Sequence, residues 1–299
     1  MLLTNTSNLK VRMTIPIYLN EADHNRDVSG LRYIYPVVSR RAEGVSIGIN
    51  LNINNACNWR CLYCQVPDLT RGTPPPIDLD LLEKELRSFL QNVLHGDFME
   101  RYVAEGDRHL QDIAFSGNGE PTSAKEFPEA VQIVEKVLHA FGLLDANREK
   151  PIKVRLITNG SLLDKPAIIE SIKHLARCNG EVWFKLDAGT KEGIARINDV
   201  NLNPQTHIER LKICAQACPT FIQTCMIALD GLPPSEAEIT SYLELIKQVK
   251  ELVQGIHLYG LARPSYQVEA PRLSRLEPLW LESVAERIRQ NGFTVHVSP

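Results

Sequence analysis

Residues 45–64 read VSIGINLNINNACNWRCLYC and join a short apolar run to a cluster of cysteines. In residues 45–51, apolar residues alternate with small or polar ones, a pattern that predicts a β-strand. Cys57, Cys61 and Cys64 follow, with the spacing Cys-x3-Cys-x2-Cys. Because thiolates are soft ligands that suit zinc and iron–sulfur clusters, this stretch predicts a metal-binding loop directly after a strand.

After Gly44, short apolar runs alternate along the chain with segments of helical periodicity. Parallel strands joined by helices cross over in a right-handed sense, so such a series builds either a doubly wound sheet or a barrel. In both architectures ligands collect at the carboxyl ends of the strands, and the spacing of the units does not choose between them. The expected strands are 45–51, 112–115, 152–157, 181–186, 221–229 and 256–261, and the expected helices are 78–103, 127–142, 164–177, 204–218, 239–253 and 279–290.

Length and composition exclude several classes of protein. The 299 residues suit two domains or one α/β barrel with attachments, and 43% hydrophobic with 23% charged residues is typical of a globular protein. A net charge of −3, from 33 basic and 36 acidic residues, creates no overall basic field for a nucleic acid or a membrane. No apolar run reaches the ~18 residues of a membrane span, and Met1–Arg12 lacks the apolar segment of a secretory signal. We therefore expect a cytoplasmic protein.

The seven cysteines divide into three in the loop and four downstream. A chain of this size needs no disulfides to fold, and in a reducing compartment clustered cysteines indicate metal or redox chemistry. The downstream cysteines are expected to pack as small buried hydrophobic residues. They are Cys178, Cys214, Cys218 and Cys225.

The cysteine loop is compatible with three kinds of metal protein. A [4Fe–4S] cluster held at three corners leaves one iron free to coordinate a small molecule, as an open position does in catalytic zinc sites. A [4Fe–4S] electron-transfer protein would hold the same cluster without a bound small molecule. A structural zinc module normally needs four protein ligands, and the nearest candidate for the fourth is His95.

The motif Cys57-x3-Cys61-x-Tyr63-Cys64, after the first strand of a βα series, resembles the signature of the radical S-adenosylmethionine (SAM) superfamily. The resemblance implies a [4Fe–4S] cluster bound by the three cysteines, with SAM chelating the fourth iron through its amino and carboxylate groups. It implies reductive cleavage of SAM to a 5′-deoxyadenosyl radical that abstracts hydrogen from a substrate, with an external electron donor such as flavodoxin or ferredoxin. It also implies an α/β fold, a partial (βα)6 TIM-like barrel, which agrees with the alternation along the chain.

A segment after the second expected strand is a candidate for binding SAM. Gly117, Asn118, Gly119 and Glu120 resemble the family's glycine–glycine–glutamate motif, with Asn118 in place of a glycine. In the family, the backbone and the acidic side chain of this motif receive the amino group of SAM. The alternative reading, a dinucleotide loop, is weak because Thr122 replaces the third glycine of G-x-G-x-x-G.

Two more strand ends carry polar side chains. Thr158 and Asn159 follow the third expected strand and are candidates for contacting SAM or substrate, although Asn-Gly is also an ordinary turn signal. Lys185 and Asp187 end the fourth strand, and their spacing puts both side chains on one face. The resemblance suggests contacts to the SAM carboxylate or ribose, and a buried ion pair is the alternative.

The residues assign no catalytic side chain and no substrate. The basic residues nearest the expected mouth could recognise a phosphate or carboxylate on a substrate, or could be ordinary surface charges. They are Arg40, Arg41, Arg71 and Arg263.

The resemblance extends beyond the cysteine loop. Ser39–Arg41, Phe115–Thr122 and Leu258–Ser265 resemble a branch related to the tRNA wyosine-base-forming radical SAM enzymes, which makes tRNA a candidate substrate. Those enzymes carry three additional N-terminal cysteines, and this chain has none before Cys57. The expected organisation is an N-terminal attachment at 1–43, a radical SAM (βα)6 core at 44–265, and a C-terminal helix and tail at 266–299.

Overall fold

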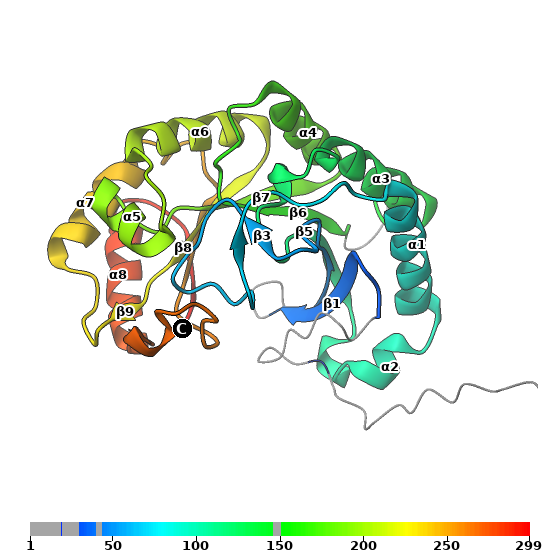
Figure 1. Cartoon of the computed structure of the whole chain (residues 1–299), viewed down its shortest axis with the longest axis horizontal. Coiled ribbons are helices and arrows are strands. Elements are labelled where there is room, and N and C mark those ends of the chain that lie inside the picture. The colour runs from blue at the N-terminus through cyan, green and yellow to red at the C-terminus, as the bar shows by residue number, and fades with distance from the viewer. Residues whose placement is uncertain (1–18, 20–29, 40–43, 146–150) are drawn as a thin grey trace, which may run out of the picture.

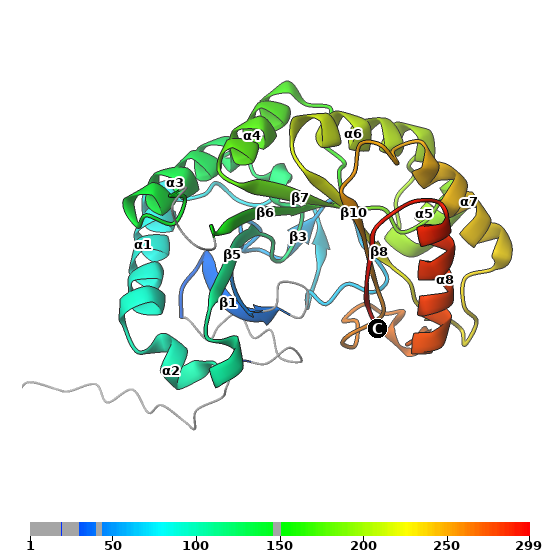
Figure 2. The same cartoon turned by 180° about the vertical axis from the view of Figure 1, so that it is seen from behind.

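The computed structural model describes residues 19, 30–39, 44–145 and 151–299 (Figures 1 and 2). Its main sheet has eight strands in the order β1-β2-β5-β6-β7-β8-β10-β12. β1 pairs antiparallel with β2, and every later pair of neighbours is parallel. The strands are β1 Ile34–Ser39, β2 Gly44–Ile49, β5 Leu110–Phe115, β6 Lys153–Thr158, β7 Gly180–Lys185, β8 Thr220–Cys225, β10 Gly255–Tyr259 and β12 Val295–Ser298.

The helices form an outer arc around this curved sheet (Figures 1 and 2). They are α1 Leu79–His95, α2 Phe98–Tyr102, α3 Phe127–Ala140, α4 Pro166–Arg177, α5 Lys191–Asn198, α6 Pro204–Ala217, α7 Glu236–Lys247 and α8 Pro278–Gln290. Each of β2, β5, β6, β7, β8 and β10 is followed by at least one of these helices, and β1 and β12 leave the sheet open at its two edges. The predicted partial (βα)6 barrel is therefore confirmed. Among the described residues, no helix is long and apolar enough to cross a membrane.

Four local features differ from the sequence prediction. β1 and β12 were not expected as strands, because an antiparallel edge strand containing Pro36 and a terminal strand both lie outside the βα alternation. The helix expected at 78–103 ends at His95 and is followed by the separate α2. The strand expected at 221–229 is divided into β8 and the short β9, Ala228–Leu229, which pairs with β11, Leu273–Ser274. The predicted boundaries of the attachment, core and tail stay predictions.

The two faces of the sheet have different chemistry. On the outer face, the fully buried Val45, Ile47 and Ile49 of β2 belong to the same hydrophobic core as residues of α1 such as Leu86. On the inner face, polar side chains such as Ser46 line a cavity. The same division holds in β8. Gln223 and Cys225 line the cavity, while the hydroxyl of Thr224 is hydrogen-bonded to that of Tyr242 in α7 at 2.7 Å.

A buried ion cluster occupies the inner face where the strands begin. Arg155 of β6 pairs with Asp112 of β5 and, at 2.6 Å, with Glu181 of β7. The hydroxyl of Ser46 donates to Asp112, and the indole N–H of Trp183 donates to Glu181 at 3.0 Å. Burial of ions is tolerated only when each has partners, so this cluster links four neighbouring strands and lets a polar lumen exist inside the fold.

A substitution at Gly48 tests how closely the side chain of Tyr35 in β1 packs against the inner face of β2. A Cβ at Gly48 would lie 2.1 Å from the ring of Tyr35, whereas a Cβ at Gly106 would have nothing within 4 Å. We expect Gly48→Ala to lower the free energy of unfolding by about 1–3 kcal/mol, because the aromatic ring must shift. Gly106→Ala, the matched control, should change it by less than about 0.5 kcal/mol. Equal values for the two variants in chemical denaturation would contradict this packing.

Candidate functional site

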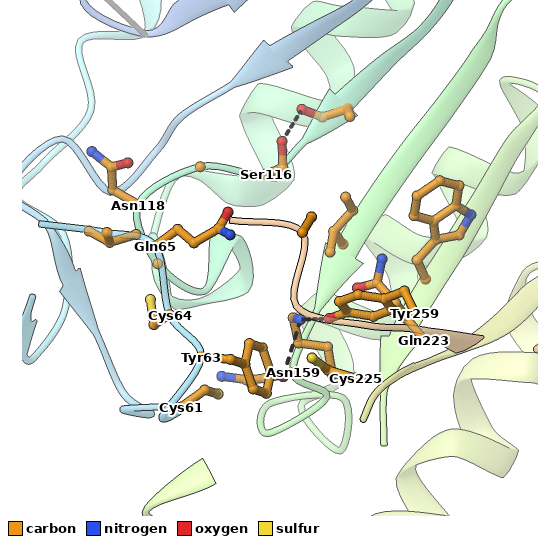
Figure 3. Close-up of a pocket in the computed structure, with 18 of the residues that line it drawn as sticks. Cys61, Tyr63, Cys64, Gln65, Ser116, Asn118, Asn159, Gln223, Cys225 and Tyr259 are labelled. Carbon is orange, nitrogen blue, oxygen red and sulfur yellow. Dashed lines mark hydrogen bonds between the residues drawn. The ribbon is translucent and has the colours of Figure 1, made fainter. Parts of the chain in front are cut away.

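The carboxyl ends of the strands surround a cavity of about 300 Å³ (Figure 3). The loop after β2 contributes Cys57, Cys61 and Cys64 to its wall, and all three are half-buried cysteines outside any disulfide. The structure therefore brings the predicted ligands together at the predicted edge of the sheet. From the other predicted segments, Tyr63, Gly117, Asn118, Gly119, Glu120, Asn159 and Lys185 also line the cavity.

The cysteine loop is held by backbone hydrogen bonds to distant segments. Leu62 N–H donates to the carbonyl of Ile197 in α5 at 2.9 Å, and Tyr266 N–H donates to the carbonyl of Cys64 at 2.9 Å. The guanidinium of Arg60 makes two 2.8 Å hydrogen bonds to the carboxylate of Glu269. The position of the loop therefore depends on contacts with distant parts of the chain. Its own short strand, β3 Ala56–Cys57, pairs with the equally short β4, Thr70–Arg71.

The three loop sulfurs do not all lie as close together as the ligands of one zinc ion do. Sulfur ligands about 2.3 Å from one tetrahedral zinc lie about 3.8 Å apart. Among the described residues, three ligand atoms within 4.8 Å of one another occur at Glu135, His174 and Cys178 and not at the three loop cysteines. At least one pair of the loop sulfurs is therefore more than 4.8 Å apart, a separation that binding to a single zinc ion would have to shorten.

The candidate fourth zinc ligand is also misplaced. His95 is exposed at the last residue of α1. A helix that follows a strand runs back along the sheet, so its carboxyl end lies at the rim opposite the cysteine loop. His95 is therefore not placed to complete a zinc site with the loop cysteines.

Burial keeps the thiols of Cys57 and Cys61 protonated in the absence of a metal. It raises the pKa of Cys57 to about 11 and that of Cys61 to about 12, with smaller contributions from neighbouring charges. A coordinating metal removes the thiol proton outright. Asn198 Nδ2 donates to Cys61 Sγ at 3.3 Å, and hydrogen bonds to cluster sulfurs are one of the ways a protein sets a cluster's potential.

Glu120 ties together the segments that follow β5 and β6. Its buried carboxylate accepts hydrogen bonds from Thr122 Oγ1 at 2.6 Å, Thr158 Oγ1 at 2.7 Å and Asn159 N–H at 2.6 Å. Thr158 does not line the cavity and acts on the site through Glu120. Asn159, held in this way, donates from Nδ2 to Asn58 of the cysteine loop at 2.8 Å.

The glycines beside Glu120 allow the backbone to approach its neighbours closely. Gly117 has a φ of +133°, and a Cβ there would lie 2.4 Å from Asn50 Oδ1. A Cβ at Gly119 would lie 2.2 Å from the carbonyl oxygen of Ala56, one residue before the first cysteine. Larger side chains at either position would push this segment away from the loop.

Asn118, in the wall of the cavity, has a buried acceptor without a partner among the described residues. Its Nδ2 donates to Asn55 Oδ1 at 2.6 Å, and its N–H donates to Asn50 Oδ1 at 3.0 Å. Its Oδ1 is buried and has no hydrogen-bond partner among the described residues. Because an unsatisfied buried acceptor is costly, this oxygen suits a cationic donor such as the ammonium group of SAM. The residues present thus fit both a [4Fe–4S] cluster and SAM.

Lys185 and Asp187 both contact the hydroxyl group of Tyr63. Lys185 Nζ lies 3.5 Å from Tyr63 Oη and donates to Tyr259 Oη at 3.0 Å, and the Tyr63 hydroxyl donates to Asp187. Burial alone lowers the pKa of Lys185, but Tyr259 and Asp187 outweigh it and raise that pKa above its ordinary value. Asp187, which does not line the cavity, also accepts from Cys225 N–H at 2.8 Å.

Several residues of the site were not found from the sequence. Asn198 ends α5, a helix of eight residues that was not predicted from the sequence. Tyr259 lies in the segment 258–265 that carried the family resemblance, which is the signal that could have found it. Cys225 was expected in the core but lines the cavity beside Tyr63, whereas Cys178, Cys214 and Cys218 do lie in the hydrophobic core.

The predicted basic residues have different positions. Arg263 lines the cavity, and its Nε donates to Gln65 Oε1 at 2.9 Å. Arg71 pairs with Asp199 at 2.9 Å, close to the end of α5. Arg40 and Arg41 lie outside the described residues. Only Arg263, of these four, is therefore placed in the cavity wall by the described structure.

Residues 51–246 match the family model of the radical SAM superfamily. Among solved structures, a radical SAM methyltransferase from Sphaerobacter thermophilus is similar with a TM-score of 0.56 at 16% identity, over 88% of this chain and 67% of that one. Native anSMEcpe with bound AdoMet (SAM) and a Cp18Cys peptide is similar with a TM-score of 0.52 at 18% identity, over 84% of this chain and 62% of that one. At these identities the two structures support the fold.

A curated relative is similar over part of its length. It is named GTPase Obg, from Brachyspira hyodysenteriae (strain ATCC 49526 / WA1), and is 27% identical over 161 residues. The match covers 53% of this chain and 20% of that protein. This chain contains no G-x-x-x-x-G-K-[ST] sequence of the kind that cradles nucleotide phosphates.

His207 of α6 packs beneath the cysteine loop and makes the free energy of unfolding depend on pH. Its Nε2–H donates to the carbonyl of Lys185 at 2.9 Å, and its ring contacts Trp59 of the cysteine loop. Burial lowers its pKa to about 4 from the ordinary 6.5. As the pH falls below about 6.5, the imidazole of His207 binds a proton in the unfolded chain but not in the folded chain. The free energy of unfolding therefore decreases.

We expect the buried His207 to lower the free energy of unfolding by about 2 kcal/mol as the pH falls from about 7.5 to about 5. Chemical denaturation of the cluster-free protein measures this change. His207→Gln should show a correspondingly smaller loss over the same interval. The exposed His139 of α3 provides the control, because His139→Gln should keep the wild-type pH dependence. A His207→Gln variant with the wild-type slope would contradict the burial argument.

Proposed function

The chain belongs to the radical SAM superfamily, and we propose that it reductively cleaves SAM at a [4Fe–4S] cluster to form a 5′-deoxyadenosyl radical that abstracts hydrogen from a substrate. One observation carries the proposal: three cysteine thiols from one loop open on a cavity at the carboxyl ends of parallel strands. The family uses a [4Fe–4S] cluster and SAM, and its members are enzymes. Ligand sites at this edge of such folds are the general rule.

The residues around the cavity have distinct roles in this proposal. Cys57, Cys61 and Cys64 hold the cluster, which when bound supplies the electron that breaks a carbon–sulfur bond of SAM. Asn118 Oδ1, buried without a partner among the described residues, receives the ammonium group of SAM. Lys185, aimed at the cavity by Tyr259, is a donor for the carboxylate or ribose.

The remaining predicted residues act by positioning these groups. Glu120 fixes Asn159 against the cysteine loop, and Asp187 fixes the ring of Tyr63 beside the cavity. Both carboxylates accept several hydrogen bonds from the protein, and these bonds hold the carboxylates in place. These hydrogen bonds favour a positioning role for both carboxylates.

Cys225 makes the electron-transfer alternative testable. It is the fourth cysteine in the cavity wall and lies on β8 beside Tyr63. If Cys225 completed the coordination of the cluster, no iron would remain open, and the site would resemble that of an electron carrier. A ligand set of three cysteines leaves the iron that SAM needs.

We expect the protein, loaded with iron and sulfide without oxygen, to release 5′-deoxyadenosine from SAM under dithionite. SAM should also change the EPR signal of the reduced cluster. Cys61→Ala should lose the cluster and the product, because only two loop ligands remain. Cys225→Ala should keep both, as should Cys218→Ala, a core cysteine outside the cavity.

The outcomes separate the three interpretations. Loss of the cluster in Cys225→Ala, with no response of the wild type to SAM, would establish an electron-transfer site. A colourless protein with bound zinc would establish a zinc module. Asn118→Ala should keep the cluster but weaken SAM binding by about 10–100-fold, the value of a hydrogen bond to a charged group. Asn291→Ala, at the end of α8, is its control.

The finer assignment concerns the substrate, and we propose a place in the branch related to the wyosine-base-forming enzymes. Its support is that two of the three resembling segments reach the cavity, through Gly117–Glu120 and Gly260–Arg263. Arg263 supplies a cation that suits a substrate phosphate. A flavodoxin or ferredoxin would supply the electron.

This assignment predicts a changed tRNA. A strain lacking the gene should lose one modified nucleoside, or accumulate its precursor, in mass spectrometry of digested tRNA. Restoring the gene should restore the nucleoside, whereas restoring a Cys61→Ala copy should not. Unchanged tRNA together with an altered small metabolite would reject the tRNA assignment and leave the radical SAM activity intact.

A further inference from the structure

A second group of potential metal ligands lies away from the cavity, between α3 and α4. Glu135 comes from α3, His174 from α4, and Cys178 from the residue that directly follows α4. One ligand atom from each of the three lies within 4.8 Å of the others. The two helices run side by side in the outer arc, and none of the three residues lines the cavity (Figures 1 and 2).

We propose that Glu135, His174 and Cys178 form a zinc-binding site that joins α3 to α4. A thiolate, an imidazole and a carboxylate are the three ligand types that zinc takes in proteins, and a water molecule would complete a tetrahedron. The mixed sulfur, nitrogen and oxygen set distinguishes this site from the all-sulfur cluster loop. Nothing in this inference rests on the reaction proposed for the cavity.

The sequence already places two of the ligands on one face. His174 and Cys178 are four residues apart, the spacing that puts side chains above one another on a helix. The half-buried Glu135 reaches them from the neighbouring helix, and Cys178 is buried. The side chains therefore converge from two elements that the core already packs together.

The present distances require only small adjustments. His174 Nε2 and Glu135 Oε2 lie 2.5 Å apart, and the ligand atoms of all three residues lie within 4.8 Å of one another. Bonds of about 2.0–2.3 Å to a tetrahedral zinc would set the ligand atoms about 3.3–3.7 Å apart. Moving the closest pair apart by about 1 Å is within the range of side-chain rotations at a half-buried position.

The surrounding charges permit the ion. A thiolate and a carboxylate together neutralise a divalent cation. The nearby Lys173 is paired with Glu170 at 2.8 Å. The exposed Arg177 donates to His174 Nδ1 at 3.1 Å, and it must turn toward solvent when Nδ1 carries the proton of a zinc-bound imidazole. Its exposed position leaves room for that movement.

The test uses full-length protein with the iron–sulfur cluster loaded, so that the loop cysteines are occupied. After incubation with zinc and removal of the excess, we expect about one zinc per chain. The zinc-edge X-ray absorption spectrum should show one sulfur at about 2.3 Å and nitrogen or oxygen neighbours at about 2.0–2.1 Å. This measurement is specific for zinc, so the iron of the cluster does not interfere.

Single substitutions identify the ligands. Cys178→Ser should remove the sulfur neighbour, and Glu135→Gln and His174→Gln should each reduce zinc affinity at least about tenfold. Cys214→Ser is the matched control, because Cys214 is an equally buried cysteine that contacts Thr220 instead of a carboxylate or histidine. It should keep the zinc and its sulfur neighbour. Near-UV circular dichroism checks that each variant is folded, and the half-buried Glu135 and His174 keep the test valid if Cys178→Ser unfolds.

Three results would overturn the site. The first is wild-type protein that retains no zinc. The second is equal zinc retention by wild type, Glu135→Gln and His174→Gln. The third is a spectrum with several sulfur neighbours and a matching loss of iron, which would place the zinc on the loop cysteines. Failure of the protein to cleave SAM would leave the zinc result unchanged.

Discussion

Parallel hydrogen bonding along the sheet is the constraint on which the rest of this structure depends. From β2 to β12 every neighbouring pair runs in the same direction, so each strand delivers its carboxyl end to one rim. The cysteine loop, the Gly117–Glu120 segment, Asn159 and Lys185 meet there although they are far apart in sequence. The helices that return along the outer face supply the apolar burial that keeps this sheet together.

The polar lumen is stable because its charges have partners. Near the start of the strands, Arg155 lies between Asp112 and Glu181, and near their ends Asp187 accepts from Tyr63, Asn198 and Cys225. Removing one partner from such a buried group costs several kcal/mol, so these networks fix their side chains firmly. Fixed surroundings of this kind hold the ligand-binding groups in place before a ligand arrives.

Much of the fold could be predicted because periodicity is local. The alternation in β2 and the apolar stripe of α1 follow from neighbouring residues, and both elements formed where expected, apart from the end of α1 at His95. β1 and β12 could not be found in this way, since an edge strand is defined by the partner it pairs with. The short helix α5 was also missed, yet it holds the cysteine loop through Ile197 and Asn198.

The sequence by itself determined the chemistry of the cofactor loop, because three cysteines at fixed spacing carry their ligand character wherever the chain folds. It also determined the βα order, because hydrophobic periods of two and 3.6 residues belong to single elements. Only the tertiary structure decided what the other polar residues do. Glu120 accepts hydrogen bonds from four donors of the protein, Asn118 Oδ1 is buried without a partner among the described residues, and Cys225 lines the cavity instead of the core. These outcomes depend on which strand face points inward and on partners tens of residues away, and hydrogen bonds of that range exist only once the sheet has formed.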